Sequence, residues 1–497
     1  MFFRLGWPAL PFTPFLFVAF VPLFYIEDDI SKQTIPNHLS IWKWPFIAFL
    51  IFNISTCYMF SQFSWLGSIS IWLLNSFLMS LAFFFFHITK QYFSRRVGYF
   101  AFVIYWLALE WLQYHWTFNF PWLNLGNAWG EHPWVVYWYQ LTGVGGGTLW
   151  ILLLNLIFYS LFNQIKNKER KLLKPLLLLT ISILLPYGLS YLMSIFYVHE
   201  FEHKLTKKHT IAIQPNRQSF KEKELKLYSI SKDHQTIFEE LDGFINGKTE
   251  IIVYPENYKS VNFEPKLNLP SLQKKDEVMS GLTLYQNDKL KGSISRFNTL
   301  FYYDEQAHYL VKEKMVPGSE YLPFGNYFGI KRQEDHFDFP NKTGELSYAT
   351  NDSFPLPAAI CYEAVFGELI ASRAKGNGYP MYIVSDEVWM QGTELYHQSL
   401  NMARLRAIEN IKFVVKCTNS GITALIHPNG KIINQLEPNI AAQLTIDPLY
   451  WRESELFYQT HGDYIYRLAA WISVLLLGYT LVASLTNNYK FKRLGTR

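Results

Sequence analysis

The sequence predicts a polytopic α-helical membrane domain joined to a globular α/β domain, and two observations lead to this fold class. Of the 497 residues, 50% are apolar and only 17% are charged, against about 25% in ordinary soluble domains. The charges are also unevenly distributed, because residues 1–198 hold 17 of the 85 charged residues but 13 of the 16 tryptophans. We therefore expect the first part of the chain to lie in a lipid bilayer and most of the rest to fold in water.

Apolar stretches long enough to cross the bilayer define the membrane domain, since a spanning helix needs about 20 residues. There are seven, at residues 5–26, 44–62, 68–88, 98–116, 141–162, 172–198 and 464–486. Four prolines predict a kinked or partly re-entrant first stretch, which also lacks the small-residue cleavage site of a signal peptide. The predicted domains are a six-span helical domain at 1–198, a globular domain at 199–463, a terminal helix at 464–486 and a basic tail at 487–497.

Basic residues in short loops predict the orientation, because lysine and arginine are enriched on the cytoplasmic side. The loops 89–97 and 163–174 and the tail after residue 486 are basic, whereas 117–140 contains neither lysine nor arginine. This pattern places the N-terminus and residues 199–463 outside the cytoplasm. The net charge of +5 comes without a basic stripe in the globular domain, so we expect no nucleic-acid partner.

Glu110 is a carboxylic acid inside an apolar stretch. There it costs about 2.5–3.5 kcal/mol on insertion scales unless it is paired or faces water. One interpretation places it beside a substrate path, and the other makes it a buried, hydrogen-bonded structural group. The glycine-rich run at 143–147, which follows the motif at 120–126, predicts close packing of helices in lipid.

The globular domain alternates between short apolar or β-branched runs and helical patterns, which predicts a mixed α/β or α+β sandwich. The expected strands lie at 210–213, 250–254, 278–285, 299–303, 358–361, 381–385, 413–417 and 423–427. The longest helical pattern covers 394–410. About 240 residues are enough for one sizeable core.

Several kinds of site are excluded by their missing motifs. The chain has no P-loop, no dinucleotide-binding G-x-G-x-x-G after a strand, no H-E-x-x-H and no G-x-S-x-G elbow. Its 13 histidines are scattered, so we expect neither a metal nor a cofactor. Three cysteines do not form a disulfide framework.

Three short sequence motifs remain as candidates for a site, each at the end of an expected strand or on a loop. They contain Glu256 after a proline, Lys312 after an apolar run, and Cys361 at the end of Ala358-Ala-Ile. Taken singly, each residue has an ordinary structural explanation, because cysteine is often a small buried apolar residue and lysine is usually solvated. Together, a carboxylate, an ammonium and a thiol are the parts that nucleophilic catalysis requires.

The order Glu256, Lys312, Cys361 resembles the triad of the nitrilase superfamily. Combined with the multi-span membrane domain, the chain resembles the apolipoprotein N-acyltransferase family over nearly its whole length. The other matching phrases are 120–126, Arg296-Phe-Asn-Thr299, Val316-Pro317, Glu320-Tyr-Leu-Pro323, Ile360-Cys-Tyr-Glu363, 385–389, Met402-Ala-Arg404 with Arg406 and Glu409, and Thr418-Asn-Ser-Gly421. The resemblance implies a nitrilase-like αββα sandwich docked on the membrane domain.

Site roles follow from the resemblance residue by residue. Cys361 matches the family nucleophile, Glu256 the general base and Lys312 the lysine that supports the oxyanion. Two further carboxylates of the family pocket match Glu320 and Glu363, and the tyrosine beside the nucleophile matches Tyr362.

The activity that the resemblance implies is acyl transfer from a phospholipid, through a thioester on Cys361, to the N-terminal amine of a diacylglyceryl-cysteine apolipoprotein. Such an enzyme lies in the bacterial inner membrane with its catalytic domain in the periplasm. Two alternatives stay open. One is a membrane-tethered amidase or acyltransferase with another amine acceptor, and the other is a non-enzymatic receptor or transport component, against which the intact triad argues.

The sequence departs from the family pattern in four places. The usual Phe-Gly after Val-Pro is Gly318-Ser319, the usual Asn-Asp-Ala-Trp-Phe reads Asp386-Glu-Val-Trp-Met390, and no tryptophan occurs near 220–222. The family also has eight spans, and the first apolar run here resembles its second. We expect either a natural shortening or a start codon assigned too far downstream.

Overall fold

The computed structural model describes residues 1–32, 38–62, 65–168, 172–200, 209–217, 250–262, 277–288, 293–324, 337–339, 353–447, 449 and 455–494. The chain divides into two compact units. The first comprises residues 1–189 and 463–497, and the second comprises residues 190–462.

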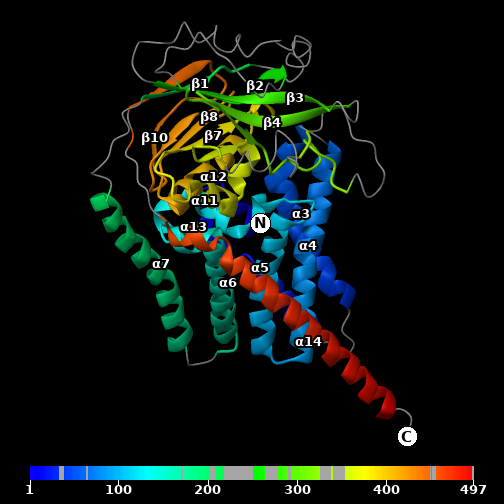
Figure 1. Ribbon diagram of the computed structural model, residues 1–497. Helices are drawn as coiled ribbons and strands as arrows, with labels where there is room; N and C mark the ends of the chain where they lie inside the picture. Colours follow the sequence, from blue (N-terminus) through cyan, green and yellow to red (C-terminus); the bar gives the residue numbers. More distant parts are fainter. Residues whose placement is uncertain are drawn as a thin grey trace. The chain divides into compact units, whose positions relative to one another are not determined.

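The first unit is helical (Figure 1). Its α-helices are α1 (Phe2–Leu5), α2 (Val21–Ser31), α3 (His38–Cys57), α4 (Trp65–Tyr92), α5 (Arg95–His115), α6 (Tyr139–Lys166), α7 (Leu173–Glu200), which runs into the second unit, and α14 (Tyr464–Leu494). Short 3-10 helices lie at η1 (Thr13–Val18), η2 (Tyr58–Gln62), η3 (Pro121–Leu123), η4 (Leu125–Glu131) and η5 (Pro133–Val135). Among the described residues, five helices (α3, α4, α6, α7 and α14) are long and apolar enough to cross a membrane.

The structure adds detail to two of the seven expected spans, the first of which was predicted to be kinked or partly re-entrant. The stretch at 5–26 is not one helix but the end of α1, then η1 and the first part of α2, because its prolines interrupt the helical hydrogen-bond ladder. The stretch at 98–116 forms helix α5, which is less apolar than the five helices named above. Its tyrosines, Gln113 and Glu110 lower its mean hydropathy, and most of them are buried inside the unit.

Glu110 of α5 is a buried hydrogen-bond acceptor. Its Oε1 accepts from Trp106 Nε1 at 3.0 Å and from the Leu125 amide at 2.9 Å. Its Oε2 accepts from the hydroxyls of Thr148 in α6 and Tyr466 in α14, each at 2.7 Å. Three of these four bonds tie α6, α14 and the motif at 120–126 to α5, which agrees with the structural interpretation of this carboxyl group.

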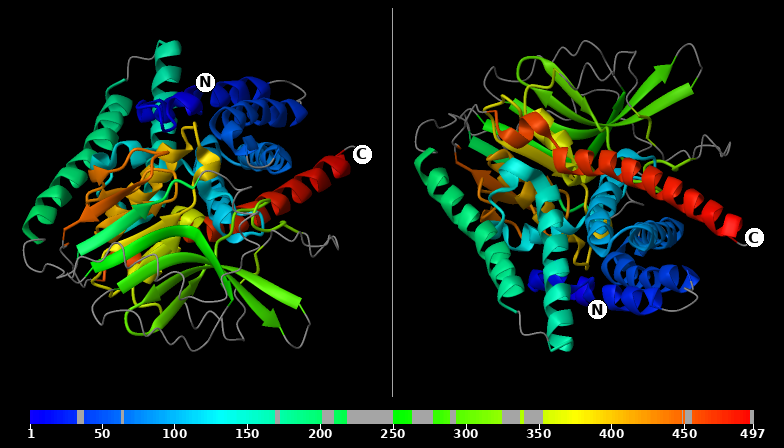
Figure 2. Two further views of the ribbon diagram at one scale, coloured as in Figure 1. Left: turned by 90° about the horizontal axis from the view of Figure 1, so that it is seen from above. Right: turned by 90° about the horizontal axis from the view of Figure 1, so that it is seen from below.

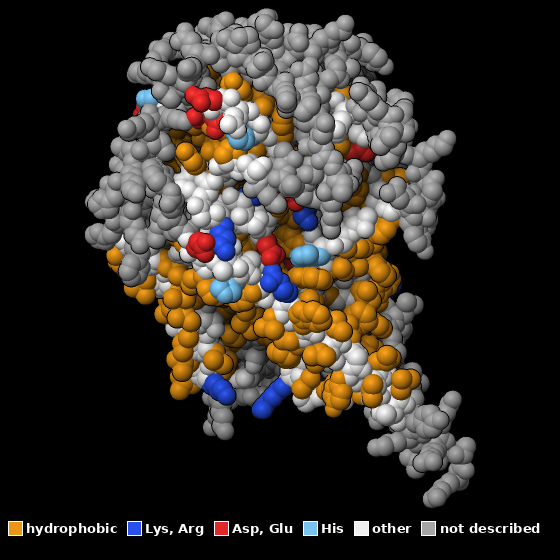
Figure 3. Space-filling view, in the orientation of Figure 1, with side chains coloured by type: hydrophobic (Ala, Val, Ile, Leu, Met, Phe, Trp, Pro, Cys, Tyr) orange, Lys and Arg blue, Asp and Glu red, His pale blue; other side chains and the backbone are white. Residues whose placement is uncertain are grey.

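The surface of the helical unit is apolar, as expected for helices that contact lipid. Large exposed side chains of α7 and α14 include Leu177, Leu184, Leu185, Trp471 and Leu475, and apolar side chains cover much of the helical surface in the face that Figure 3 shows.

Lys90 and Arg95, two of the basic residues used to predict orientation, pair with the α2 acids Glu27 and Asp28. Since acidic residues contribute little to the orientation rule, this pairing leaves the expected orientation unchanged.

The second unit contains two β-sheets (Figures 1 and 2). The first sheet has the order β11-β1-β2-β3-β4-β5 and the second the order β10-β9-β8-β7-β6. The strands are β1 (His209–Gln214), β2 (Glu250–Asn262), β3 (Glu277–Asp288), β4 (Ser293–Tyr303), β5 (Ala307–Val311), β6 (Ala358–Ile360), β7 (Met381–Ser385), β8 (Val414–Thr418), β9 (Ala424–Ile426), β10 (Ile432–Gln435) and β11 (Ala442–Ile446).

One apolar core joins the two sheets, with side chains such as Val253, Met279, Ile360, Val384 and Val415 in one cluster. Strand residues alternate between two faces, so neighbouring positions in the first sheet form a second apolar cluster that includes Ile211, Ile252 and Tyr254. Helices α11 (Gly367–Ala374) and α12 (Leu395–Asn410) cover the other face of the second sheet, and the short α13 (Phe457–His461) packs on α11. This arrangement confirms the nitrilase-like sandwich.

Three strands were missing from the sequence prediction. They are β5, β10 and β11, and each lies at the edge of its sheet. An edge strand is only partly buried, so its alternation is weak; three of the four β10 residues, for example, are exposed. The expected tryptophan loop near 220–222 lies outside the described residues.

Candidate active site

Glu256 is held in an irregular part of strand β2. The register between β2 and β3 shifts between Tyr254 and Lys259, as in a β-bulge, a feature found next to many active sites. Across the ladder, a Cβ added to Gly281 would lie 2.4 Å from the Cα of Glu256 and 2.5 Å from the carbonyl oxygen of Pro255. The β2 backbone at Glu256 can approach β3 this closely only because residue 281 is glycine.

We expect Gly281→Ala to reduce activity by about 10- to 100-fold, because the added methyl group must displace the Glu256 backbone, and small misplacements of catalytic groups are costly. Gly478→Ala is the matched control, since nothing lies within 4 Å of its added Cβ. The measurement is the rate of acyl transfer, with the melting temperature of each variant alongside. An active Gly281→Ala enzyme would show that Glu256 tolerates displacement or has no catalytic role.

Lys312 follows strand β5 and is fully buried. Its backbone N–H donates to the carbonyl of Asn298 on β4 at 2.8 Å, which fixes the point where the chain leaves the sheet. Its Nζ lies 2.8 Å from Glu256 Oε1 and 2.7 Å from Glu320 Oε1. The structure therefore brings three of the expected site residues into direct contact.

Glu320 reaches this cluster from a tight turn. Its Oε2 accepts from the amide of Val316 at 2.8 Å, and its own amide donates to the carbonyl of Val316 at 3.0 Å. Within the turn, Gly318 has a φ of +81°, a conformation that glycine adopts without strain. The unusual Gly318-Ser319 pair thus places a glycine where the turn needs one.

Cys361 begins the 3-10 helix η6 (Cys361–Val365) directly after β6. Its φ is +50°, a strained left-handed conformation that occurs preferentially at functional sites. Cys361 is partly accessible, and its thiol interacts electrostatically with Glu256, Lys312 and Glu320. All three members of the expected triad, together with Glu320, therefore share one site.

The charges of this cluster shift one another's pKa values. Burial, together with the carboxylate of Glu256, raises the pKa of the Cys361 thiol well above its ordinary value, despite the opposing charge of Lys312. Burial opposes the charge of Lys312, but Glu256 and Glu320 raise the pKa of its ammonium well above the usual range. Burial and the charge of Glu256 also raise the pKa of Glu320. A thiol in this setting needs a base to remove its proton as it attacks.

Glu363 belongs to a different cluster. Its carboxylate accepts from the amides of Ile360 at 2.9 Å and Glu313 at 2.8 Å, and it forms a salt bridge of 2.7 Å with Arg373 on α11. Burial would raise the pKa of Glu363, but the charge of Arg373 and the hydrogen bonds to the carboxylate together lower it. Glu363 fixes the loops on both sides of the site rather than contacting Lys312.

Two neighbours of the site complete its description. The side chain of Tyr362 is buried, with its ring 5.4 Å from that of Phe366. Lys314 is half-buried, with its Nζ 5.1 Å from the centre of the Phe366 ring. Burial lowers the pKa of Lys314.

Sequence reasoning missed the roles of three polar groups. The buried Asn298 donates through Nδ2 to Glu256 Oε1 at 2.7 Å and to Glu320 Oε1 at 3.2 Å, so one amide bridges both carboxylates. The amide of Asp386 donates to Glu256 Oε2 at 2.9 Å, and the Ser385 hydroxyl reaches Cys361. For Ser385 and Asp386 the available signal was a polar residue at the carboxyl end of a buried parallel strand. Asn298 lies within the antiparallel strand β4, where this signal is missing.

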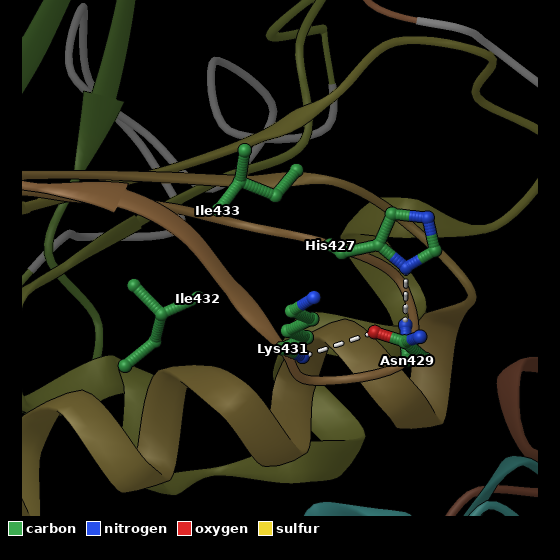
Figure 4. A pocket seen from close by; sticks show the side chains of 5 residues that line it. All are labelled: His427, Asn429, Lys431, Ile432 and Ile433. Carbon is green, nitrogen blue, oxygen red and sulfur yellow. Dashed lines mark hydrogen bonds between the residues drawn. The ribbon is translucent and has the colours of Figure 1, made fainter.

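A separate surface pocket lies at the turn between β9 and β10 (Figure 4). Its lining is His427, Asn429, Lys431, Ile432 and Ile433. Hydrogen bonds within the turn hold it, with Asn429 N donating to His427 Nδ1 at 3.2 Å and Lys431 N donating to Asn429 Oδ1 at 3.0 Å. It contains none of the expected site residues, so it plays no part in the proposal below.

Comparison with known proteins gives two family matches within the chain. Residues 1–157 match the apolipoprotein N-acyltransferase N-terminal domain, and residues 265–453 match the carbon-nitrogen hydrolase family. Among curated proteins, the apolipoprotein N-acyltransferase of Pasteurella multocida is 27% identical over 88% of this chain and 86% of its own length. That of Haemophilus influenzae is 27% identical over 87% of this chain and 84% of its own.

Among solved structures, a CN-hydrolase superfamily protein from Xanthomonas campestris is 13% identical, with a TM-score of 0.28. It covers 49% of this chain, and 91% of its own chain is matched. The family matches and the two curated relatives cover both units of the chain, so they bear on the helical and the sandwich parts together.

Proposed function

This chain belongs to the apolipoprotein N-acyltransferase family, and we propose that it moves an acyl chain from a phospholipid to the N-terminal amine of a diacylglyceryl-cysteine apolipoprotein. The observation that carries this proposal is the contact of Lys312 with both Glu256 and Glu320 beside the partly accessible Cys361. A partly accessible thiol beside a buried base and a buried cation suits acyl transfer through a covalent intermediate.

In the first half-reaction, the sulfur of Cys361 attacks the ester carbonyl carbon of the phospholipid while Glu256 takes the thiol proton. The carbonyl oxygen becomes negative in the tetrahedral intermediate. Lys312 uses two of its three N–H groups on the carboxylates, and we assign the third to this oxygen, where a positioned donor stabilises the developing charge. The C–O bond then breaks, and Glu256 returns the proton to the departing lysophospholipid oxygen.

In the second half-reaction, the α-amine of the apolipoprotein attacks the thioester carbon. An amine proton passes to Glu256, the C–S bond breaks, and the sulfur of Cys361 recovers a proton from Glu256. The products are an amide on the lipoprotein and the free thiol. Both half-reactions use Glu256 as the base and Lys312 as the cation. One base and one cation beside the sulfur of Cys361 are therefore enough for the whole cycle.

Both substrates are lipids or lipid-anchored, so the proposal includes a place for the reaction. We assign the chain to the bacterial inner membrane, with residues 199–463 in the periplasm and the tail from residue 487 in the cytoplasm. The basic loops 89–97 and 163–174 support this orientation, and the five apolar helices support membrane insertion.

Reporter fusions test this orientation. A reporter that is active only outside the cytoplasm should work when fused after Glu200 and should fail when fused within loop 89–97 or after Arg497. The physical reason is the retention of basic segments in the cytoplasm. Reporter activity at Arg497 would reverse the orientation and separate Cys361 from lipid of the outer leaflet.

Mass spectrometry of lipoprotein N-termini tests the activity itself. In cells that lack the gene, lipoproteins should carry a free α-amine on the diacylglyceryl cysteine, and restoring the gene should add one acyl group by an amide bond. Fully acylated lipoprotein N-termini in cells without the gene would show that this α-amine is not the acceptor of our enzyme. Acylation of a different amine by the purified protein would then favour a membrane-tethered amidase or acyltransferase.

A further inference from the structure

The end of strand β7 places Ser385 next to Cys361. Strands β6 and β7 run parallel with Ile360 opposite Val384, so the next residues along, Cys361 and Ser385, leave the sheet side by side. Ser385 is buried, and its hydroxyl lies close enough to Cys361 to act on the thiol by lowering its pKa. The proposed mechanism gives this hydroxyl no role.

The same hydroxyl has a second acceptor behind the site. Ser385 Oγ lies 3.3 Å from Glu387 Oε1. The Glu387 carboxylate is fully buried, and its Oε1 also accepts from Lys416 Nζ at 2.7 Å and from Ser399 Oγ at 2.6 Å. The contact with Ser385 is the longest of the three, so it is the one that Glu387 loses at least cost.

The charge of Glu387 remains compensated when Ser385 turns away. Lys416 stays within salt-bridge distance, and Ser399 still donates to the same oxygen. A thiolate at Cys361, in contrast, is surrounded by the carboxylates of Glu256 and Glu320, with Lys312 as the opposing charge. Both acceptors are anions, but Glu387 keeps two other donors whereas the thiolate faces two carboxylates. A hydrogen bond to a charged group is strong, so the hydroxyl contributes more to the thiolate than to Glu387.

We propose that Ser385 is a positioning residue for Cys361, whose hydroxyl donates to Glu387 while the thiol is protonated and to the sulfur when the thiolate forms. It would act twice in each cycle, once as the thiol loses its proton and once as sulfur leaves the thioester. This inference rests on the proposed role of Cys361 as the nucleophile. The Glu387–Lys416 pair serves as the fixed support from which the hydroxyl turns.

The test compares two serine-to-alanine variants that remove donors to the same carboxylate oxygen. Ser385→Ala removes the hydroxyl beside Cys361, and Ser399→Ala removes one on α12 that lies behind Glu387. The purified, full-length proteins are treated with iodoacetamide from pH 6 to pH 10, and the alkylation of each cysteine is followed by peptide mass spectrometry. The buried Cys57 and Cys417 report folding, because they become alkylated only if the protein opens.

We expect Ser385→Ala to slow alkylation of Cys361 by roughly tenfold or more at each pH below the midpoint of its profile, as for the loss of a hydrogen bond to a charged group. Ser399→Ala should retain the wild-type profile. Unchanged alkylation in Ser385→Ala, or an equal loss in both variants, would overturn the direct role of Ser385. If wild-type Cys361 reacts no faster than the two buried cysteines, the proposed function itself fails, which is a distinguishable result.

Should Ser385→Ala open the fold, Cys57 and Cys417 will be alkylated, and Ser385→Thr then carries the test, because threonine keeps the hydroxyl donor. A folded threonine variant with the wild-type profile supports the proposal. If Ser385→Thr is folded but its Cys361 is alkylated roughly tenfold more slowly than in the wild type, the proposal is contradicted.

Discussion

Replacing Cys361 with serine is expected to abolish acyl transfer while leaving the fold intact. The substitution changes one atom in a partly accessible side chain, so packing around η6 should persist. A serine hydroxyl has a far higher pKa than a thiol, and a carboxylate such as Glu256 cannot activate it to a comparable degree. Turnover of a phospholipid and a diacylglyceryl peptide, measured with the purified protein, should fall to the uncatalysed rate.

Cys417→Ala is the control for this substitution. Cys417 lies in the core between the sheets, with its sulfur 3.3 Å from the carbonyl oxygens of Ile213 and Val253. Burial raises the pKa of its thiol, which makes it a poor nucleophile. Its loss should lower stability and leave activity in place. Full turnover by Cys361→Ser, or loss of chemistry in folded Cys417→Ala, would contradict our assignment of the nucleophile.

Lys312→Ala is expected to reduce the rate of thioester formation by on the order of 10²–10³, which is typical for the loss of one donor to a developing oxyanion. It should also destabilise the protein, because it leaves the buried Glu256 and Glu320 without their cation, and breaking such a buried pair costs about 3–5 kcal/mol. Both quantities are measurable, the first by single-turnover acylation and the second by denaturant unfolding.

Lys314→Ala is the matched control, since it removes the same group two residues along the loop. Lys314 lies over the ring of Phe366 rather than between the two carboxylates, so its loss should change the acylation rate by less than about threefold, in line with the modest value of a cation–π contact. If Lys314→Ala abolished acylation and Lys312→Ala did not, the assignment of the loop after β5 would be wrong.

Much of the fold could be predicted because burial leaves a periodic pattern in the sequence. Strand β7 has the expected bounds, and the helix expected at 394–410 is found at Leu395–Asn410. The pattern failed where burial is partial, whereas the interruption of the first stretch was expected from its prolines. The edge strands β10 and β11 expose many of their residues, and prolines break the first apolar stretch into short helices.

The candidate site was predictable in its parts but not in its connections. The order of Glu256, Lys312 and Cys361 pointed to the chemistry, and the structure brings these three residues together. Asn298 and Ser385 were harder to find, because a buried asparagine or serine in a strand usually satisfies a neighbouring backbone group. Asn298 donates to Glu256 on β2 and to Glu320 in the turn after β5, and Ser385 donates to Glu387 after β7. The closeness of Asn298 to its acceptors depends on strand register and sheet order. Glu363 shows the reverse case. The sequence placed it in the pocket with the other carboxylates, but in the structure it forms a salt bridge with Arg373.

Intact-protein and peptide mass spectrometry after brief incubation with phospholipid alone tests the central claim most directly. Our account predicts the addition of one acyl group to the peptide that contains Cys361. Neutral hydroxylamine should release this group, as it does thioesters, and a diacylglyceryl peptide should consume it at a rate no slower than overall turnover. Acyl transfer that proceeds without any adduct on Cys361, or with the adduct on another residue, would contradict the account.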